Sequence, residues 1–130
     1  MVRPRVLLAD DHSSLLEAET NLLRPYFDVV GTARTGVELV SEAMRLDPDV
    51  IVADISMPGF TGIEAFHQLR ESGSTAKIVF LTVHSEEEFV RACVAEGALG
   101  YVIKSSMKSH LVPAIKAALA GRRYIHPSLR

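Results

Sequence analysis

Residues 50–58 read Val-Ile-Val-Ala-Asp-Ile-Ser-Met-Pro, and this stretch decides the fold of the chain. Its first four residues are apolar, which predicts a buried strand that ends on the carboxylate of Asp54 before Pro58 and Gly59 turn the chain. Because a charge is costly to bury without a partner, we expect Asp54 at the carboxyl end of the strand, where open α/β sheets hold their ligands. The stretch therefore predicts that Asp54 is a nucleophile that takes up a phosphoryl group.

The composition indicates a single domain. The chain has 130 residues, of which 48% are hydrophobic, enough to fill one core. Its 14 Lys and Arg residues against 16 Asp and Glu residues leave a net charge of −2, which argues against a basic nucleic-acid surface and against a polybasic membrane patch. Cys93 is the single cysteine, so no intrachain disulfide can form. With neither a signal peptide nor a membrane span at the start, we expect a cytoplasmic protein.

Short apolar segments alternate along the chain with helical patterns. We expect strands at residues 5–9, 28–33, 50–53, 77–82 and 100–104. Helices are expected from about 13 to 24, after capping boxes at Thr35 and Thr61, after Ser85, and from about 107 to 120. The strict alternation predicts a parallel sheet with helices on both of its faces.

The helical patterns also predict which faces are buried. The first helix is expected to pack through Leu15, Ala18 and Leu22, and the second through Val37, Val40 and Met44. Pro113 falls inside the last pattern, where its ring costs about 3 kcal/mol. We therefore expect that helix either to begin late, near Ser109, or to kink in its first turns.

Polar residues stand at the ends of four of the expected strands: Asp10 and Asp11, Asp54, Thr82, and Lys104. In a parallel sheet these ends share one edge, so three carboxylates would meet there. Like charges in one site oppose joint ionisation, and a hard cation such as Mg²⁺ relieves that repulsion. Lys104 adds a positive charge and Thr82 a hydroxyl donor, which together suit phosphoryl transfer to a carboxylate. Asp10 has a second interpretation as a cap of the first helix.

The same residues carry a family resemblance. The Asp10-Asp11 pair, Asp54 with Met57-Pro58 and Gly62 behind it, Thr82 and Lys104 resemble the receiver domain of bacterial two-component response regulators, over about residues 5–121. The resemblance implies a flavodoxin-like doubly wound parallel sheet of five strands in the order 2-1-3-4-5, with five helices. It also implies that Asp54 is the phosphoacceptor of a sensor histidine kinase, and that Lys104 and Thr82 contact the phosphoryl group.

The resemblance further implies a metal site and a switch. Mg²⁺ would be held by Asp11, Asp54 and the backbone carbonyl of Ser56, with Asp10 binding through water. Tyr101 matches the aromatic residue that swings inward when Thr82 moves, and a plain core position is its alternative. Ser105 departs from the family pattern, in which a proline often follows the lysine across a cis bond, so the geometry of the peptide bond after Lys104 is left open.

Two segments resemble the LuxR/NarL-type subgroup, whose receiver precedes a DNA-binding helix-turn-helix: residues 9–12, Ala-Asp-Asp-His, and residues 120–127. We expect a receiver domain over residues 1–121 and the start of a linker to an output domain over 122–130. By this resemblance DNA is bound through the output domain, and the receiver forms a phosphorylation-linked homodimer. The resemblance also implies that the chain has no enzymatic activity beyond its own phosphorylation and slow dephosphorylation.

Three other functions are alternatives to a receiver that controls a DNA-binding output domain. A stand-alone receiver would act through protein–protein contacts. A Mg²⁺-dependent phosphatase of the haloacid dehalogenase type would want a second acid two residues after the nucleophile, where Ser56 follows Asp54 and Ser13 follows Asp11. A flavin or nucleotide binder would need a glycine-rich phosphate cradle after the first strand, and the acidic residues there would repel a phosphate.

Overall fold

The structure is a computed structural model that describes residues 3–57, 61–83 and 87–125, without the side chains of Glu87 and Phe89. Its sheet is built from six parallel strands in the order β2-β1-β3-β4-β5-β6. The strands are β1 (Arg5–Ala9), β2 (Asp28–Ala33), β3 (Val50–Ala53), β4 (Lys77–Thr82), β5 (Gly100–Ile103) and β6 (Tyr124–Ile125).

The expected flavodoxin-like order 2-1-3-4-5 is therefore present, but the expected count of five strands is wrong. The sixth strand lies in the segment that the sequence indicated as the start of a linker, and it pairs with β5 through Gly100–Tyr124 and Tyr101–Ile125. Two residues are too short for a periodic pattern, so only pairing with a finished β5 edge identifies them as a strand. The domain boundary after Gly121 stays a prediction.

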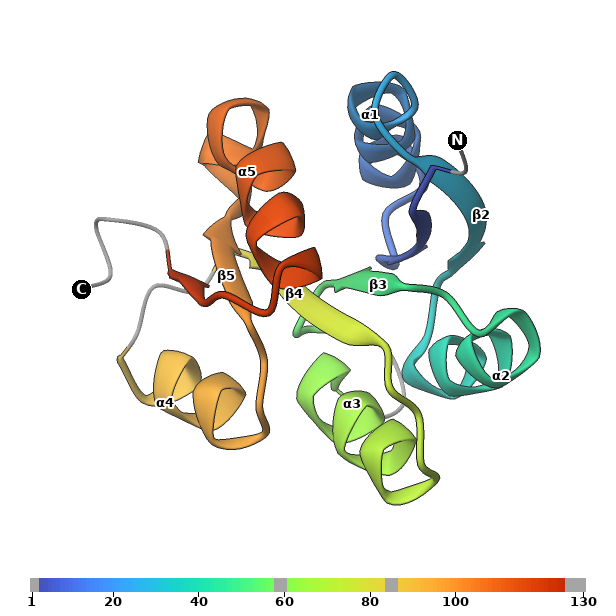
Figure 1. Ribbon diagram of the computed structural model, residues 1–130, viewed down its shortest axis with the longest axis vertical. Coiled ribbons are helices and arrows are strands. Elements are labelled where there is room, and N and C mark those ends of the chain that lie inside the picture. The colour runs from blue at the N-terminus through green and yellow to red at the C-terminus, as the bar shows by residue number, and fades with distance from the viewer. Residues whose placement is uncertain (1–2, 58–60, 84–86, 126–130) are drawn as a thin grey trace.

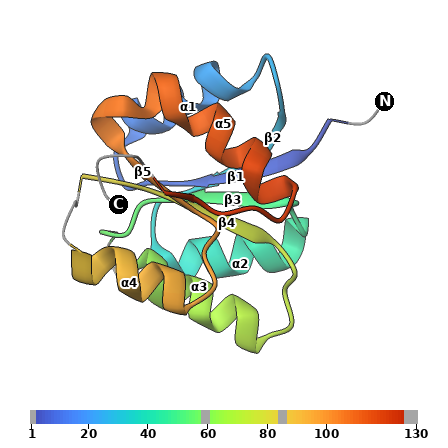
Figure 2. The ribbon, with the colours of Figure 1, turned by 60° about the vertical axis from the view of Figure 1, so that its left-hand side comes forward.

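Five α-helices cover the two faces of the sheet, as expected. They are α1 (Ser13–Leu23), α2 (Gly36–Leu46), α3 (Gly62–Glu71), α4 (Glu87–Ala95) and α5 (Met107–Leu119), and a short 3₁₀ turn, η1 (Lys104–Ser106), links β5 to α5. Figures 1 and 2 show α1 and α5 on one face and α2, α3 and α4 on the other. None of the helices in the described ranges is long and apolar enough to span a lipid bilayer.

Alternate residues of β1, β3, β4 and β5 supply two separate hydrophobic cores. In β1, Val6 and Leu8 pack with α1 and α5, whereas Leu7 and Ala9 pack on the opposite face with α2 and α3. The same alternation runs through β3, β4 and β5 because successive strand residues point to opposite faces. A sheet buried on both faces explains why the strands are apolar throughout.

The buried faces of the first two helices match the expectation only in part. Of the expected residues, Leu22 and Val40 pack partly buried against the cores. In α1 the buried residues are Leu16, Glu19 and Leu23, whereas Ala18 is exposed. In α2 they are Gly36, Leu39 and Ala43, whereas Val37 and Met44 are 59% and 58% exposed. Each helix carries two apolar stripes that are offset by about one residue, which corresponds to a rotation of 100° about the helix axis. Packing against the sheet determines which of the two stripes is buried.

The last helix begins at Met107, so the expected late start near Ser109 is wrong. Pro113 lies inside α5 and its side chain is exposed. The missing N–H therefore falls on the side of the helix that does not pack against the sheet. The buried side is formed by Leu111, Ala114, Ile115 and Ala118.

The first turns of α2 and α3 confirm both N-caps. Thr35 accepts a hydrogen bond from the backbone N–H of Glu38, and Glu38 in return accepts one from Arg34. At α3 the capping box is complete, because Thr61 and Glu64 each accept the other's backbone N–H, at 3.1 and 2.9 Å. This box anchors the helix that follows the loop after Asp54.

Candidate functional site

The carboxyl ends of β1, β3 and β5 bring three ionisable residues together at one edge of the sheet. Asp10 follows β1, Asp54 follows β3, and Lys104 opens the 3₁₀ turn after β5. The sheet hydrogen bonding continues one residue past the ends of β1 and β3. The Asp10 N–H donates to Ala33 O at 3.0 Å, and the Asp54 N–H donates to Ala9 O at 2.9 Å. The backbone of both aspartates is thus fixed by the sheet.

Lys104 lies between the two aspartates. Its Nζ atom is 2.9 Å from Asp10 Oδ2 and 3.0 Å from Asp54 Oδ2. All three side chains are buried or nearly so, with exposed fractions of 11% for Lys104, 1% for Asp10 and 6% for Asp54. The bond between Lys104 and Ser105 is trans. A lysine that bridges two buried carboxylates offsets most of the cost of burying them.

The other oxygen of each aspartate accepts a backbone hydrogen bond. Asp10 Oδ1 accepts from the His12 N–H at 3.0 Å, and Asp54 Oδ1 accepts from the Ser56 N–H at 3.2 Å. This bond is a turn contact to the N-cap residue of α1, and the start of that helix has no side-chain cap hydrogen bond, so the interpretation of Asp10 as the cap of the first helix is wrong. Both carboxylates are held from two sides, which fixes their orientation.

The three groups differ in how the site shifts their pKa. Burial raises the pKa of Asp54 above its ordinary value of 3.8, and the charge of Asp10 adds to this while Lys104 opposes it. Burial also acts to raise the pKa of Asp10, but the contacts with Lys104 and His12 outweigh it, so that pKa is lowered. For Lys104 burial acts to lower the pKa, but the two aspartates outweigh it and raise the pKa above 10.5.

Asp11 completes an acidic cluster that could hold a cation. Ligand atoms of Asp10, Asp11, His12 and Asp54 all lie within 4.8 Å of one another. Asp11 Oδ1 is buried and has no hydrogen-bond partner in the described part of the chain; His12 Nδ1 is 3.1 Å from it. Three carboxylates against one lysine leave an excess of two negative charges when all are ionised. A divalent cation with oxygen ligands fits both this charge and the unpaired oxygen.

Gly62 lets α3 begin directly behind Asp54. A Cβ atom at this position would collide with the backbone carbonyl oxygen of Asp54. The Gly62 N–H also donates to Ile55 O at 2.8 Å, which closes the loop after β3 against the helix. The close approach of two backbones therefore requires glycine here.

Of the remaining predicted residues, Thr82 and Ser56 lie at the same edge, whereas Tyr101 lies two residues before the end of β5. Thr82, fully buried, ends β4, and Tyr101, 1% exposed, lies in β5 beside Phe80. Residues 80 and 101 pack in the core beneath α3 and α4, and the strand alternation puts Thr82 on that same face. Ser56 lies next to Asp54 and is exposed. Thr82 and Tyr101 thus share a face, as a coupled pair requires, and their switch role stays a prediction.

Glu19 of α1 was missed by the sequence patterns. It is 1% exposed, and burial, together with the charge of Asp10 and a hydrogen bond to that residue, raises its pKa to about 8. A glutamate at helical spacing between Leu16 and Leu23 is the signal that could have found it, because that stripe faces the sheet. The carboxyl thus lies behind the acidic cluster, on the side of α1.

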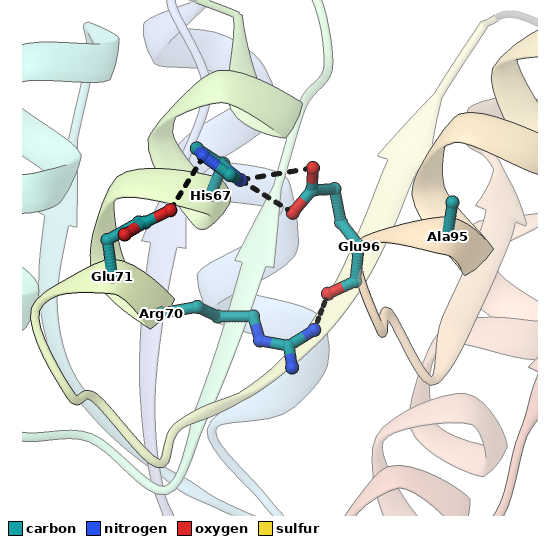
Figure 3. Close-up of a pocket in the computed structure, with 5 residues that line it drawn as sticks. All are labelled: His67, Arg70, Glu71, Ala95 and Glu96. Atoms are coloured by element: carbon teal, nitrogen blue, oxygen red, sulfur yellow. Dashed lines mark hydrogen bonds and ion pairs between the residues drawn. The ribbon is translucent and has the colours of Figure 1, made fainter.

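A second group of charged residues lies away from the sheet edge, between α3 and the end of α4 (Figure 3). His67 Nδ1 is 3.0 Å from Glu96 Oε2, and His67 Nε2 is 3.2 Å from Glu71 Oε1. The Arg70 guanidinium donates to the Glu96 carbonyl and lies over the ring of Phe66. The two glutamates approach opposite ring nitrogens, so these three residues do not converge on one point as metal ligands would.

Comparison with known proteins identifies the family. Residues 6–116 match the response regulator receiver domain. The chain is 38% identical over 127 residues to the response regulator GacA of Pseudomonas viridiflava. This alignment covers 96% of this chain and 59% of GacA. It is 37% identical to a LuxR-family two-component response regulator of Aurantimonas, with a TM-score of 0.92 over 98% of this chain and 92% of the other.

A structure of two RcsB dimers bound to two parallel DNAs also matches. The identity is 25% and the TM-score 0.89, over 98% of this chain and 65% of the RcsB chain. The chain spans about three fifths of the length of GacA. On the extent of the family match and the identity to these relatives, the chain belongs to the response regulator receiver domain family and is similar to its LuxR-type members.

Proposed function

We propose that the chain is a phosphorylation-dependent signalling switch whose phosphoacceptor is Asp54. The observation that carries this proposal is the bridge from Lys104 to Asp10 and Asp54, at 2.9 and 3.0 Å, in a buried site. The pKa of Asp54 is raised by burial whereas that of Asp10 is lowered by its contacts with Lys104 and His12, so the carboxylate of Asp54 is less stabilised by its surroundings than that of Asp10. An electron-rich carboxylate held beside a lysine suits attack on phosphorus.

The phosphoryl transfer is a single displacement at phosphorus. One oxygen of the Asp54 carboxylate attacks the phosphorus of a phosphohistidine on a sensor histidine kinase. The new O–P bond forms while the P–N bond breaks, and the imidazole of the kinase keeps the electron pair and is then protonated. Lys104 neutralises charge on the phosphoryl oxygens, and Thr82 donates its hydroxyl hydrogen to one of them.

The acidic cluster would hold Mg²⁺ during this step. The ligands would be Asp11, Asp54 and the backbone carbonyl of Ser56, with Asp10 contributing through water. When bound, the ion neutralises the phosphoryl oxygens and allows the carboxylates to remain ionised together. The ligand atoms that lie within 4.8 Å of one another and the excess negative charge support this assignment.

The longer relatives suggest how a phosphorylated receiver would act on the rest of a regulator. Phosphorylation would shift Thr82 and Tyr101 together and change the surface of α4, β5 and α5, favouring one of two states through differential contacts. In the cytoplasm, this shift would promote a homodimer and control a helix-turn-helix output domain that binds DNA. The RcsB structure, which contains dimers bound to DNA, supports a homodimer and a DNA-binding output. The chain would catalyse only its own phosphorylation and slow dephosphorylation.

Acetyl phosphate provides the test. With Mg²⁺ present, the intact wild-type protein should gain the mass of one phosphoryl group. Asp54→Asn should gain none, whereas Asp28→Asn, at the exposed start of β2, should match the wild type. Equal modification of the wild type and of Asp54→Asn would exclude Asp54 as the acceptor. Steady hydrolysis of a generic phosphate ester would favour the phosphatase instead.

A further inference from the structure

Arg34 lies between β2 and α2, and its backbone is held from both sides. The residue before it, Ala33, ends β2 and accepts the N–H of Asp10 at 3.0 Å. The N–H of Arg34 itself donates to Glu38 Oε1, in the first turn of α2, at 2.8 Å. Because the sheet holds the preceding residue and the helix holds this one, the fold sets where the side chain of Arg34 begins.

From this position the side chain of Arg34 reaches back to the loop after β1. Its Nη2 atom donates to the backbone carbonyl oxygen of Asp11 at 3.0 Å. The hydrogen bonding of α1 begins one residue later, where the Leu16 N–H donates to the carbonyl of the N-cap residue His12. Arg34 therefore supplies a charged donor to a carbonyl that the helix does not use, and bonds of this kind are stronger than those between neutral groups.

The carbonyl that Arg34 binds belongs to a peptide group whose other end contacts the cation site. The N–H of this peptide group is that of His12, and it donates to Asp10 Oδ1 at 3.0 Å. A peptide group is planar and rigid. It is therefore held at its oxygen by Arg34 and at its nitrogen by Asp10, and rotation of the group would break both hydrogen bonds.

The same peptide group connects two of the three carboxylates of the acidic cluster. Asp11, on its carbonyl side, carries a carboxylate oxygen within 4.8 Å of ligand atoms of Asp10 and Asp54. The N–H side orients the carboxylate of Asp10. A change in the tilt of the peptide group would displace the first carboxylate and release the second. One exposed arginine thus acts on both through the backbone.

We propose that Arg34 is a positioning residue of the cation site, which holds the carboxylates of Asp10 and Asp11 in place for Mg²⁺ through this peptide group. Groups that orient metal ligands typically change metal affinity 10- to 100-fold when they are removed. Because Arg34 is exposed and water competes for its hydrogen bond, we expect the lower end of that range. The inference rests on the proposed function, since it assigns the two aspartates to a cation site.

The charge of Arg34 by itself would have the opposite effect. A positive charge on this loop repels Mg²⁺, so its removal should tighten Mg²⁺ binding if only the charge matters. Loss of positioning should instead weaken Mg²⁺ binding. The direction in which the Mg²⁺ dissociation constant changes therefore separates the two effects.

Substitution of Arg34 gives the test. Arg34→Met removes the charge and every donor, and the Mg²⁺ dissociation constant, followed by NMR shifts of the His12 and Asp54 amides, should rise about tenfold. Without Mg²⁺, hydrogen exchange at the His12 amide should become several-fold faster, while exchange at the Asp54 amide, which is bonded within the sheet, should not change. Arg34→Lys, which keeps a charged N–H donor, should stay within about threefold of the wild-type dissociation constant.

Arg45 offers a matched control at the other end of α2. It is exposed, and its guanidinium pairs with Glu42. Arg45→Met changes the net charge as Arg34→Met does, and it should leave the Mg²⁺ dissociation constant and the exchange of the His12 amide unchanged. An equal change in the two variants would assign the effect to net charge and overturn the proposal.

Three further results would overturn it. These are unchanged or tighter Mg²⁺ binding in Arg34→Met, failure of Arg34→Lys to restore binding, and loss of the folded state in Arg34→Met. The titration and the exchange measurement need no phosphoryl donor. A wild type that takes up no phosphoryl group from acetyl phosphate would therefore refute the function of Asp54, while a tenfold effect of Arg34 on Mg²⁺ binding would still support its positioning role.

Discussion

Lys104 at the sheet edge and His67 of α3 each lie between two acidic side chains at nearly equal distances. At the sheet edge Lys104 lies 2.9 and 3.0 Å from Asp10 and Asp54. Between α3 and α4, His67 lies 3.0 and 3.2 Å from Glu96 and Glu71 (Figure 3). The side chain of Lys104 is 11% exposed, whereas that of His67 is 54% exposed. The two groups therefore have similar distances between their charged atoms, but only the group around Lys104 is buried.

Burial decides what each arrangement can do. Exposed ion pairs are screened by water and salt and contribute little, so the His67 group serves as a weak link between two helices. In the buried group each charge depends on its partners, and removal of one leaves the others uncompensated. A site of this kind responds strongly to a cation or a phosphoryl group. The difference favours the sheet edge over the pocket beside His67 as the proposed functional site.

The largest effect is expected when Lys104 is removed. Lys104→Met leaves Asp10 and Asp54 buried without their cation, and it should lower the free energy of unfolding by about 3 kcal/mol near neutral pH. The loss should shrink as the pH falls, because the two carboxylates become protonated. Urea unfolding measures both effects. Lys108→Met, which removes an exposed lysine of α5, is the control, and a similar loss in the two variants would contradict the comparison.

A smaller effect is expected from the cation. Mg²⁺ at ten times its dissociation constant should add about 1.4 kcal/mol to the stability of the wild type, and a chelator should reverse this. Asp11→Asn should lose most of the gain, because the unpaired Oδ1 atom belongs to the cluster. Thermal unfolding with and without MgCl₂ gives the measurement. Glu71→Gln, from the exposed group, should keep the full gain, and a loss there would show that Mg²⁺ acts at the surface.

The smallest effect is expected at His67. Its hydrogen bond with Glu96, together with the charges of Glu96 and Glu71, raises its pKa above the ordinary 6.5. Because the raised pKa belongs to the folded state, the stabilisation is present in full below pH 6.5 and is lost as the pH rises through the folded-state pKa. The Tm difference between the wild type and His67→Gln should therefore be small and positive at low pH and vanish at high pH. A difference that grows with pH, or that persists in high salt, would contradict this account.

The site could be predicted from the sequence because it depends on strand ends. Asp10, Asp54, Thr82 and Lys104 each follow or close an apolar run, and parallel strands place such residues at one edge. The structure brings Lys104 to both aspartates and places Thr82 on the same face as Tyr101. The capping signals at Thr35 and Thr61 were equally informative, because a cap involves only residues three positions apart.

Features that depend on packing between elements could not be predicted in this way. In α1 the pairs Leu15-Leu16 and Leu22-Leu23 offer two stripes, and contact with the sheet buries the one that contains Glu19. The strand β6 exists only because the edge of β5 is free to pair with it. The contact between His67 and Glu96 joins α3 to the residue just after α4, 29 positions apart, which no local pattern records.

By itself, the sequence determined the alternation of strands and helices, the parallel sheet and the line of acidic strand ends, because hydrophobic periodicity and capping are local properties of the chain. Only the tertiary structure decided which helix stripe is buried, that this stripe in α1 includes Glu19, and that one lysine serves two carboxylates. The reason is physical. Burial and charge pairing arise from the distance between elements, and that distance is set only when all of the elements pack together.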